Sequence, residues 1–204
     1  MLTVACVLSE GPKRNYDKTH VERLRGMVAQ HIKQPYKFVC VNDSPFPGWW
    51  AKVSLCEPGR FSGRVLYLDL DTTVIGNLDD LADYPYPFAA ISDYQFPLTI
   101  NSSVMSWNAG FLDHVYKNFT LDVMNRLHGD QNWLHEQANA FHFPKQWCPS
   151  YREHVLKGGM HPDARVVVHH GFPKPWDDEV AKYVKDFRRA SGPYFDKVLA
   201  RSLD

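Results

Sequence analysis

The stretch GRVLYLDLDTTVIGNLDDL, residues 63–81, decides the fold that the sequence predicts. Residues 65–68 are apolar without a break, which is typical of a strand covered on both faces in a parallel or mixed sheet. Asp69 and Asp71 follow directly at the carboxyl end of this strand. Open α/β sheets bind ligands at the carboxyl ends of their strands, so these two acids mark a candidate site.

Asp69 and Asp71 are spaced to act together. Residues two apart on an extended chain point to the same side, with Cα atoms roughly 6.5 Å apart. Two such carboxylates can share a hard cation, and Mg²⁺ or Mn²⁺ leaves further positions for water or substrate phosphate. The alternative is that both acids are turn residues, since Asp is common where a strand ends.

Elements of both kinds flank this stretch. Strands are predicted over residues 2–8, 36–41, 88–91, 103–107, 141–143 and 165–169, and helices over residues 16–32, 111–127, from 130 onward, and in a charged tail over 177–204. Residues 49–55 form a short element of undefined type. This order predicts a single α/β domain over residues 1–204, in which Asp130 is placed to cap its helix.

Composition excludes several functional classes. Lys and Arg total 23, as do Asp and Glu, so nothing indicates an electrostatic grip on nucleic acid or on an anionic membrane. The apolar residues 2–8 are too short to span a membrane and predict a strand instead. The four cysteines are scattered and are interpreted as reduced core thiols of a cytoplasmic protein.

A second cluster of reactive residues is HHGFPKPW, residues 169–176, after the predicted strand over 165–169. His169 or His170 can supply a neutral ring nitrogen to a metal ion. Gly171 lets the backbone approach a phosphate closely, and Lys174 gives it a positive charge. The alternative is an ordinary loop with a solvated lysine. We expect this loop and the two acids to converge on one cation and the pyrophosphate bound to it.

Taken in order, these motifs resemble those of GT-A glycosyltransferases, most of all the retaining family-eight type that includes glycogenin and lipopolysaccharide galactosyltransferases. The segments that carry the resemblance are LSEG with Tyr16, YLDLDTTVIGNLDDL, INSSVMSWNAGF, GDQNWL and HHGFPKPW, and they cover most of the chain. The resemblance implies a GT-A fold, with a mixed, mainly parallel sheet flanked by helices.

Two positions depart from the pattern of that family. Its metal-binding His precedes the Gly by three residues, a position that Val168 occupies here. The departure leaves open which histidine joins Asp69 and Asp71 as the third metal ligand; His170 is favoured, with His169 as the alternative. Ser103 also stands where a Gly is usual, which changes the expected shape of the sugar pocket.

The resemblance also implies an activity. It implies transfer of a hexose from a UDP-sugar to a hydroxyl of an acceptor that the sequence does not identify, with retention and with Mn²⁺ or Mg²⁺ as cofactor. It assigns Leu8, Ser9, Tyr16, Lys52, Asp69, Gly171 and Lys174 to donor binding, and Asn101, Asp130 and Gln131 to the surroundings of the donor sugar. Lys52 as a surface lysine and Asp130 as a helix cap are the alternatives for these two residues.

Two other functions fit the same residues. VLYLDLDTTV also matches the motif of haloacid-dehalogenase-type phosphatases, in which Asp69 would be the nucleophile. Such motifs normally lie on the first strand, whereas about 60 residues precede this one. The third interpretation is a nucleotide-sugar binding module without turnover, favoured by the altered His spacing and by Ser103.

Overall fold

The computed structural model describes residues 1–9, 16–177 and 180. Its strands are β1 (Leu2–Val7), β2 (Tyr36–Val41), β3 (Arg64–Leu68), β4 (Thr72–Val74), β5 (Phe88–Ser92), β6 (Ile100–Asn108), β7 (Phe141–His142) and β8 (Val166–Val168). Its helices are α1 (Lys18–His31), α2 (Asp79–Ala82), α3 (Asp113–Lys117), α4 (Leu121–Arg126), α5 (Asp130–Gln137) and α6 (Leu156–Gly158), with the 3₁₀ helices η1 (Gly48–Cys56) and η2 (Lys145–Trp147) and the π-helical turn η3 (Tyr151–Val155). Most of the helical tail predicted over 177–204 lies outside the described residues.

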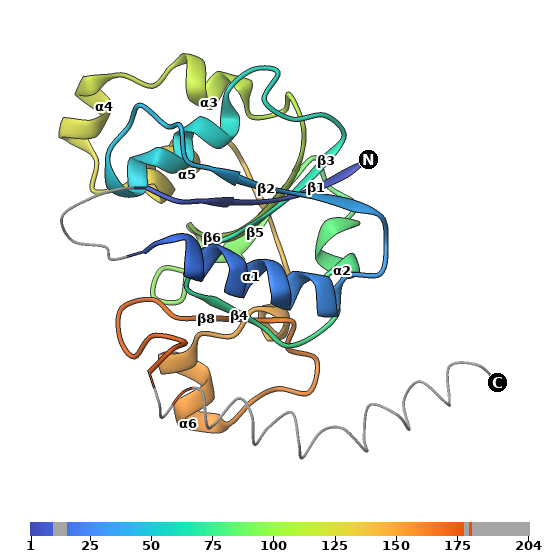
Figure 1. The fold of residues 1–204 in the computed structure, drawn as a ribbon. Coiled ribbons are helices and arrows are strands. Elements are labelled where there is room, and N and C mark those ends of the chain that lie inside the picture. Colours follow the sequence, from blue (N-terminus) through green and yellow to red (C-terminus); the bar gives the residue numbers. More distant parts are fainter. Residues whose placement is uncertain (10–15, 178–179, 181–204) are drawn as a thin grey trace.

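The central sheet has the strand order β2-β1-β3-β6-β5-β7. β1 pairs in parallel with β2 and β3, and β5 pairs in parallel with β7. β6 runs antiparallel to both of its neighbours, β3 and β5. Helices lie on both sides of this sheet (Figure 1). The prediction of a mixed, mainly parallel sheet flanked by helices is confirmed.

Each face of the sheet has its own core. On one face, Val21, Leu24 and Val28 of the amphipathic helix α1 are buried against even-numbered residues of β1 and β3, such as Leu66 and Leu68. On the other face, η1, α3 and α5 pack on a core that includes odd-numbered residues of β1 and β3, such as Tyr67. Because successive side chains of a strand point to opposite faces, the unbroken apolar run of β3 serves both cores.

A short turn after β3 leads the chain into a second, smaller sheet. The Asp69 amide donates to the Ser103 carbonyl at 2.9 Å, and the Thr72 amide and hydroxyl both donate to the Asp69 carbonyl, at 3.1 and 2.8 Å. β4 then pairs antiparallel with β8, with Thr72 opposite Val168. This pairing brings the loop after β8 to the carboxyl end of β3.

Three local predictions were wrong. The helix predicted over 111–127 is two helices, α3 and α4, because the chain turns extended at Thr120. The strand predicted over 103–107 begins earlier, at Ile100, and β4 was not predicted at all. The cap of α5 is Gly129, not Asp130, and no side chain caps that helix end. The element over 49–55 is the 3₁₀ helix η1.

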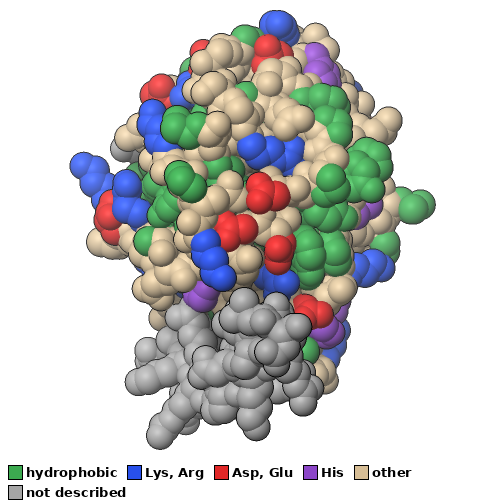
Figure 2. Space-filling view, turned by 90° about the vertical axis from the view of Figure 1, so that its right-hand side faces the viewer, with side chains coloured by type: hydrophobic (Ala, Val, Ile, Leu, Met, Phe, Trp, Pro, Cys, Tyr) green, Lys and Arg blue, Asp and Glu red, His purple; other side chains and the backbone are tan. Residues whose placement is uncertain are grey.

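The surface carries charges of both signs. On the face drawn in Figure 2, which includes the side where the N-terminus lies in Figure 1, acidic and basic side chains lie among each other and among apolar ones. This mixing agrees with the balanced composition of the chain. In the part of the chain that the structure describes, no helix has both the length and the apolar character to cross a membrane.

Candidate functional site

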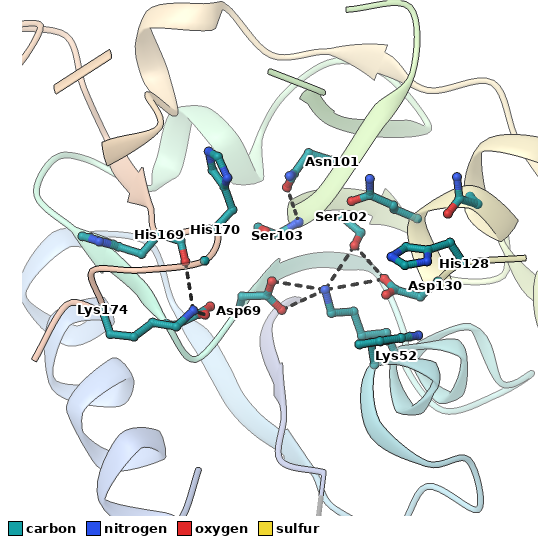
Figure 3. Close-up of a pocket in the computed structure, with 16 residues that line it drawn as sticks. Lys52, Asp69, Asn101, Ser102, Ser103, His128, Asp130, His169, His170 and Lys174 are labelled. Carbon is teal, nitrogen blue, oxygen red and sulfur yellow. Dashed lines mark hydrogen bonds and ion pairs between the residues drawn. The ribbon is translucent and has the colours of Figure 1, made fainter. Parts of the chain in front are cut away.

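A cavity of about 320 Å³ opens at the carboxyl end of β3. The start of the antiparallel strand β6 and the N-terminus of α5 border it, and the loop after β8 completes it. Trp49 and Lys52 of η1 line it as well, and Figure 3 shows the labelled side chains converging from these separate segments. The cavity is lined by Trp49, Lys52, Asp69, Asp71, Asn101, Ser102, Ser103, His128, Gly129, Asp130, Gln131, Asn132, His169, His170, Gly171 and Lys174.

Lys52 connects two of the acids. Its ammonium nitrogen lies 3.0 Å from Asp69 Oδ1, 3.5 Å from Asp130 Oδ2 and 3.1 Å from Ser102 Oγ (Figure 3). Ser102 Oγ donates to Asp130 Oδ2 at 2.6 Å, and the Tyr67 hydroxyl donates to Asp69 Oδ1 at 2.5 Å. Lys52 is 8 % exposed, so the alternative of a surface lysine is wrong. Asp69 and Asp130 are held in fixed orientations by shared hydrogen bonds.

Lys174 joins the loop after β8 to the second acid of the pair. Its Nζ lies 2.6 Å from Asp71 Oδ2 and donates to the His169 carbonyl at 3.1 Å. The Tyr16 hydroxyl donates to the same Asp71 oxygen at 2.8 Å. The predicted convergence of the acidic strand end with the loop after β8 is therefore confirmed.

The two histidines are held by other side chains. His169 is buried, with Nε2 3.2 Å from Thr73 Oγ1 and its ring stacked on Tyr151. Burial lowers the pKa of His169 to about 4, and burial also lowers the pKa of His170. His170 Nε2 lies 2.6 Å from Ser150 Oγ, and its ring stacks on Tyr94. Both rings are neutral at pH 7, and in Figure 3 both point away from Asp69.

The expected set of three metal ligands is not assembled in this structure. Within residues 1–9, 16–177 and 180, no three His, Cys, Asp or Glu side chains form a group that could hold a metal ion. Asp69 and Asp71 do line the same cavity, and their carboxylate oxygens are the donors that Mg²⁺ and Mn²⁺ prefer. The chemistry of the two acids fits a hard cation, and His170 as its third ligand stays a prediction.

Most of the other predicted residues lie at the cavity. Asn101 Oδ1 accepts from the Ser103 amide at 2.9 Å, and Gln131 Nε2 lies 3.5 Å from Asp93 Oδ2. Gly171 has a φ of +76°, a conformation that favours glycine. Asn101, Gln131 and Gly171 all line the main cavity.

The predicted first loop lies beside the main cavity. Ser9 and Tyr16 line a smaller adjoining hollow, which shares Trp49, Lys52, Asp69 and Asp71 with the main cavity. Leu8 packs against the core on the α1 face instead of lining either hollow.

Sequence reasoning gave no role to several residues of the site, among them Ser102, Trp49 and His128. Ser102 lies inside the INSSV segment, and its role comes from its hydrogen bonds with Lys52 and Asp130. Trp49 and His128 stack with ring centroids 6.0 Å apart at the cavity wall. They lie 79 positions apart and belong to no common sequence motif, so only the fold brings them together.

The architecture has similar counterparts among solved structures, although not among sequences. No known protein-family profile matches the sequence, and no curated protein matches it. Among solved structures, the apo form of the glycosyltransferase GlyE of Streptococcus pneumoniae TIGR4 is similar, with a TM-score of 0.66 at 16 % identity, over 96 % of this chain and 63 % of that chain. A second GlyE structure gives a TM-score of 0.66 at 14 % identity, over 90 % of this chain and 60 % of the other.

Two further solved structures are similar over nearly their whole length. The galactosyltransferase LgtC, in complex with donor and acceptor sugar analogs, gives a TM-score of 0.62 at 14 % identity, over 94 % of this chain and 95 % of that chain. A glycosyltransferase involved in glycosylation of the major capsid of PBCV-1 gives a TM-score of 0.58 at 15 % identity, over 91 % of this chain and 97 % of that chain. The chain spans less than two thirds of the GlyE chains. Identities this low define the fold alone, and that fold is the GT-A fold of glycosyltransferases.

Proposed function

We propose that the protein is a glycosyltransferase that moves a hexose from a UDP-sugar to an acceptor hydroxyl, with retention and with a divalent cation. One observation carries this proposal: in a GT-A fold, Asp71 pairs with Lys174 of the loop after β8, and Asp69 lines the same cavity. Ligands of open α/β sheets bind at this end of the strands. The phosphatase alternative loses support because the acidic strand is the third along the chain in a glycosyltransferase-like fold.

The charges of the cavity support a cation bound together with a diphosphate. Three acids, Asp69, Asp71 and Asp130, line it with only two lysines, Lys52 and Lys174. A diphosphate alone would add negative charge to this excess of carboxylates. Like charges 4 Å apart repel by about 1 kcal/mol in water and by about 4 kcal/mol at an effective dielectric of 20. A divalent cation held by Asp69 and Asp71 would offset this repulsion and stabilise the diphosphate as a leaving group.

The chain's own residues supply the remaining contacts. Lys174 reaches Asp71 from a loop, so its ammonium group can turn to a diphosphate oxygen once a cation neutralises that carboxylate. The Gly171 amide lies on the same loop and can donate to the same group. Lys52 keeps Asp69 and Asp130 oriented through the transfer. Asn101, Asp130 and Gln131 surround the donor sugar and accept hydrogen bonds from its hydroxyl groups.

A donor screen tests the proposal. The protein is incubated with Mn²⁺ and a panel of nucleotide sugars, and released UDP is measured. We expect slow release from one UDP-sugar by hydrolysis even without an acceptor. Hydrolysis of p-nitrophenyl phosphate without any UDP-sugar binding would instead support the phosphatase. UDP binding that needs Mn²⁺, without turnover of any donor, would support the binding module.

Replacing Asp71 tests the cation site directly. We expect Asp71→Asn to abolish Mn²⁺-dependent UDP binding in titration calorimetry, because one of the two anionic anchors is lost. Asp122→Asn is the control, since Asp122 is exposed on α4, away from the cavity. Unchanged UDP affinity in a folded Asp71→Asn protein would refute the metal site.

A further inference from the structure

Two cysteines face each other on neighbouring strands, outside the cavity. Cys6 of β1 and Cys40 of β2 are direct partners in the parallel register. Neighbouring strands lie about 4.8 Å apart, and a disulfide spans Cα separations of about 4.4 to 6.8 Å. The backbone therefore holds the two thiols within reach of a covalent bond.

The two thiols differ in access and in acidity. Cys6 is buried, while Cys40 is partly exposed on β2, the edge strand of the described sheet. A hydrogen bond from Cys6, aided by the Leu8 amide and the Arg25 guanidinium, lowers the pKa of Cys40 to about 7. The same hydrogen bond and burial raise the pKa of Cys6. The thiolate is the reactive form, so Cys40 is the accessible nucleophile and Cys6 its neighbour.

The other two cysteines are internal references. Cys56 and Cys148 are buried, and burial raises the pKa of both thiols. Neither has another cysteine as its register partner in the described strands. Their reactivity reports how an ordinary core thiol of this protein behaves.

We propose that Cys6 and Cys40 form a redox-modification site, at which a hydroperoxide oxidises Cys40 and Cys6 then closes a disulfide between β1 and β2. This proposal does not depend on the glycosyltransferase assignment. The strand register carries it, because it places one partly exposed thiol directly opposite one buried thiol.

The chemistry balances with hydrogen peroxide as the oxidant. The Cys40 thiolate attacks one peroxide oxygen, an S–O bond forms, the O–O bond breaks, and the departing hydroxide takes up a proton to become water. The Cys6 sulfur then attacks the sulfur of the Cys40 sulfenic acid, so that the S–S bond forms and the S–O bond breaks. The proton of Cys6 leaves with the hydroxyl group as a second water. The two thiols lose two electrons and the peroxide gains them.

Alkylation rates test the first step. The folded full chain is treated with limiting iodoacetamide at pH 7, and each cysteine peptide is quantified by mass spectrometry. We expect Cys40 to be alkylated at least tenfold faster than Cys56 and Cys148. Equal rates at the three positions would overturn the proposal.

Peroxide treatment tests the second step. We expect a non-reducing peptide map to show the Cys6 and Cys40 peptides linked, with a mass loss of two hydrogens that dithiothreitol reverses. In Cys6→Ala or Cys6→Ser, whichever keeps the native circular dichroism, dimedone should trap sulfenic acid on Cys40. Cys148→Ser is the matched control and should still form the link. Thiols that stay reduced, or a sulfenic acid on Cys40 that persists in the wild type, would overturn the proposal.

Discussion

At the scale of a single residue, Lys174 joins two segments of the site that lie 103 positions apart in the sequence. We expect Lys174→Met to weaken Mn²⁺-dependent UDP binding by tenfold or more, about 1.4 kcal/mol, since a charge contact to the diphosphate is lost. Titration calorimetry measures this change. The matched control is Lys157→Met, which removes another 2.6 Å ion pair, with Glu153, on an exposed helix surface. Equal UDP affinities for the two variants would contradict the role of Lys174.

His169 predicts how stability depends on pH. Its folded-state pKa of about 4 lies below the ordinary value of 6.5, because the neutral ring is buried. The folded state therefore binds fewer protons than the unfolded state between these two values. The contribution of His169 is complete above pH 6.5 and is lost as pH falls toward 4, by on the order of 3 kcal/mol.

Urea unfolding at pH 7.5, 5.5 and 4.5 measures this loss. We expect His169→Phe to flatten the decline in the free energy of unfolding over this range, because its ring cannot take up a proton. His135→Phe serves as the control, since His135 is exposed on α5. The same decline in wild type and His169→Phe would show that the proton uptake lies elsewhere.

At the scale of an element, the loop after β8 depends on Gly171. Its φ of +76° is strained for any residue with a side chain, and an added Cβ would lie 3.1 Å from an Arg152 nitrogen. We expect Gly171→Ala to cost about 1 kcal/mol in stability and to weaken UDP binding. Gly110→Ala is the matched control, with a φ of +88° and open space around its Cβ, away from the main cavity. Thermal unfolding and UDP titration should separate the two variants, and equal UDP binding would contradict a phosphate contact at Gly171.

The small sheet of β4 and β8 is the element that makes the site possible. β4 follows Asp71 and β8 precedes His169, and the pairing of these two strands places Asp71 against Lys174. Val168 is buried opposite Thr72 in this sheet. It stands at the position of the metal-binding His in the family that the sequence resembles. An imidazole at this position would have to displace part of the core, so the local packing favours Val.

At the scale of the whole molecule, the charges of the cavity predict coupled binding. We expect UDP and Mn²⁺ together to raise the melting temperature by about 5 to 10 °C at a hundredfold excess over Kd, from about 2.7 kcal/mol of binding. Each alone should give little change, because UDP meets an excess of carboxylates and Mn²⁺ meets carboxylates already paired with lysines. Differential scanning fluorimetry measures these shifts. A full shift with UDP alone would show that the cavity needs no cation.

The fold was predictable because strong local patterns carried it. Burial produces patterns that extend over only a few residues, such as the apolar run of β3 and the helical spacing of Val21, Leu24 and Val28. β4 escaped prediction because three residues are too few to show a period, and because its partner β8 lies more than 90 positions away. Asp130 resembled a cap in sequence, yet in the structure its carboxylate turns to Ser102 and Lys52.

By itself, the sequence determined the α/β architecture, the position of Asp69 and Asp71 at a strand end, and the expectation that the loop carrying Lys174 lies near them. Only the tertiary structure decided which charges meet, that Lys52 serves two acids, and that the rings of His169 and His170 turn to Thr73 and Ser150. The physical reason is the distance along the sequence over which each effect acts. Strand and helix patterns arise from neighbouring residues, whereas the direction of a polar side chain depends on partners that folding brings from distant parts of the chain.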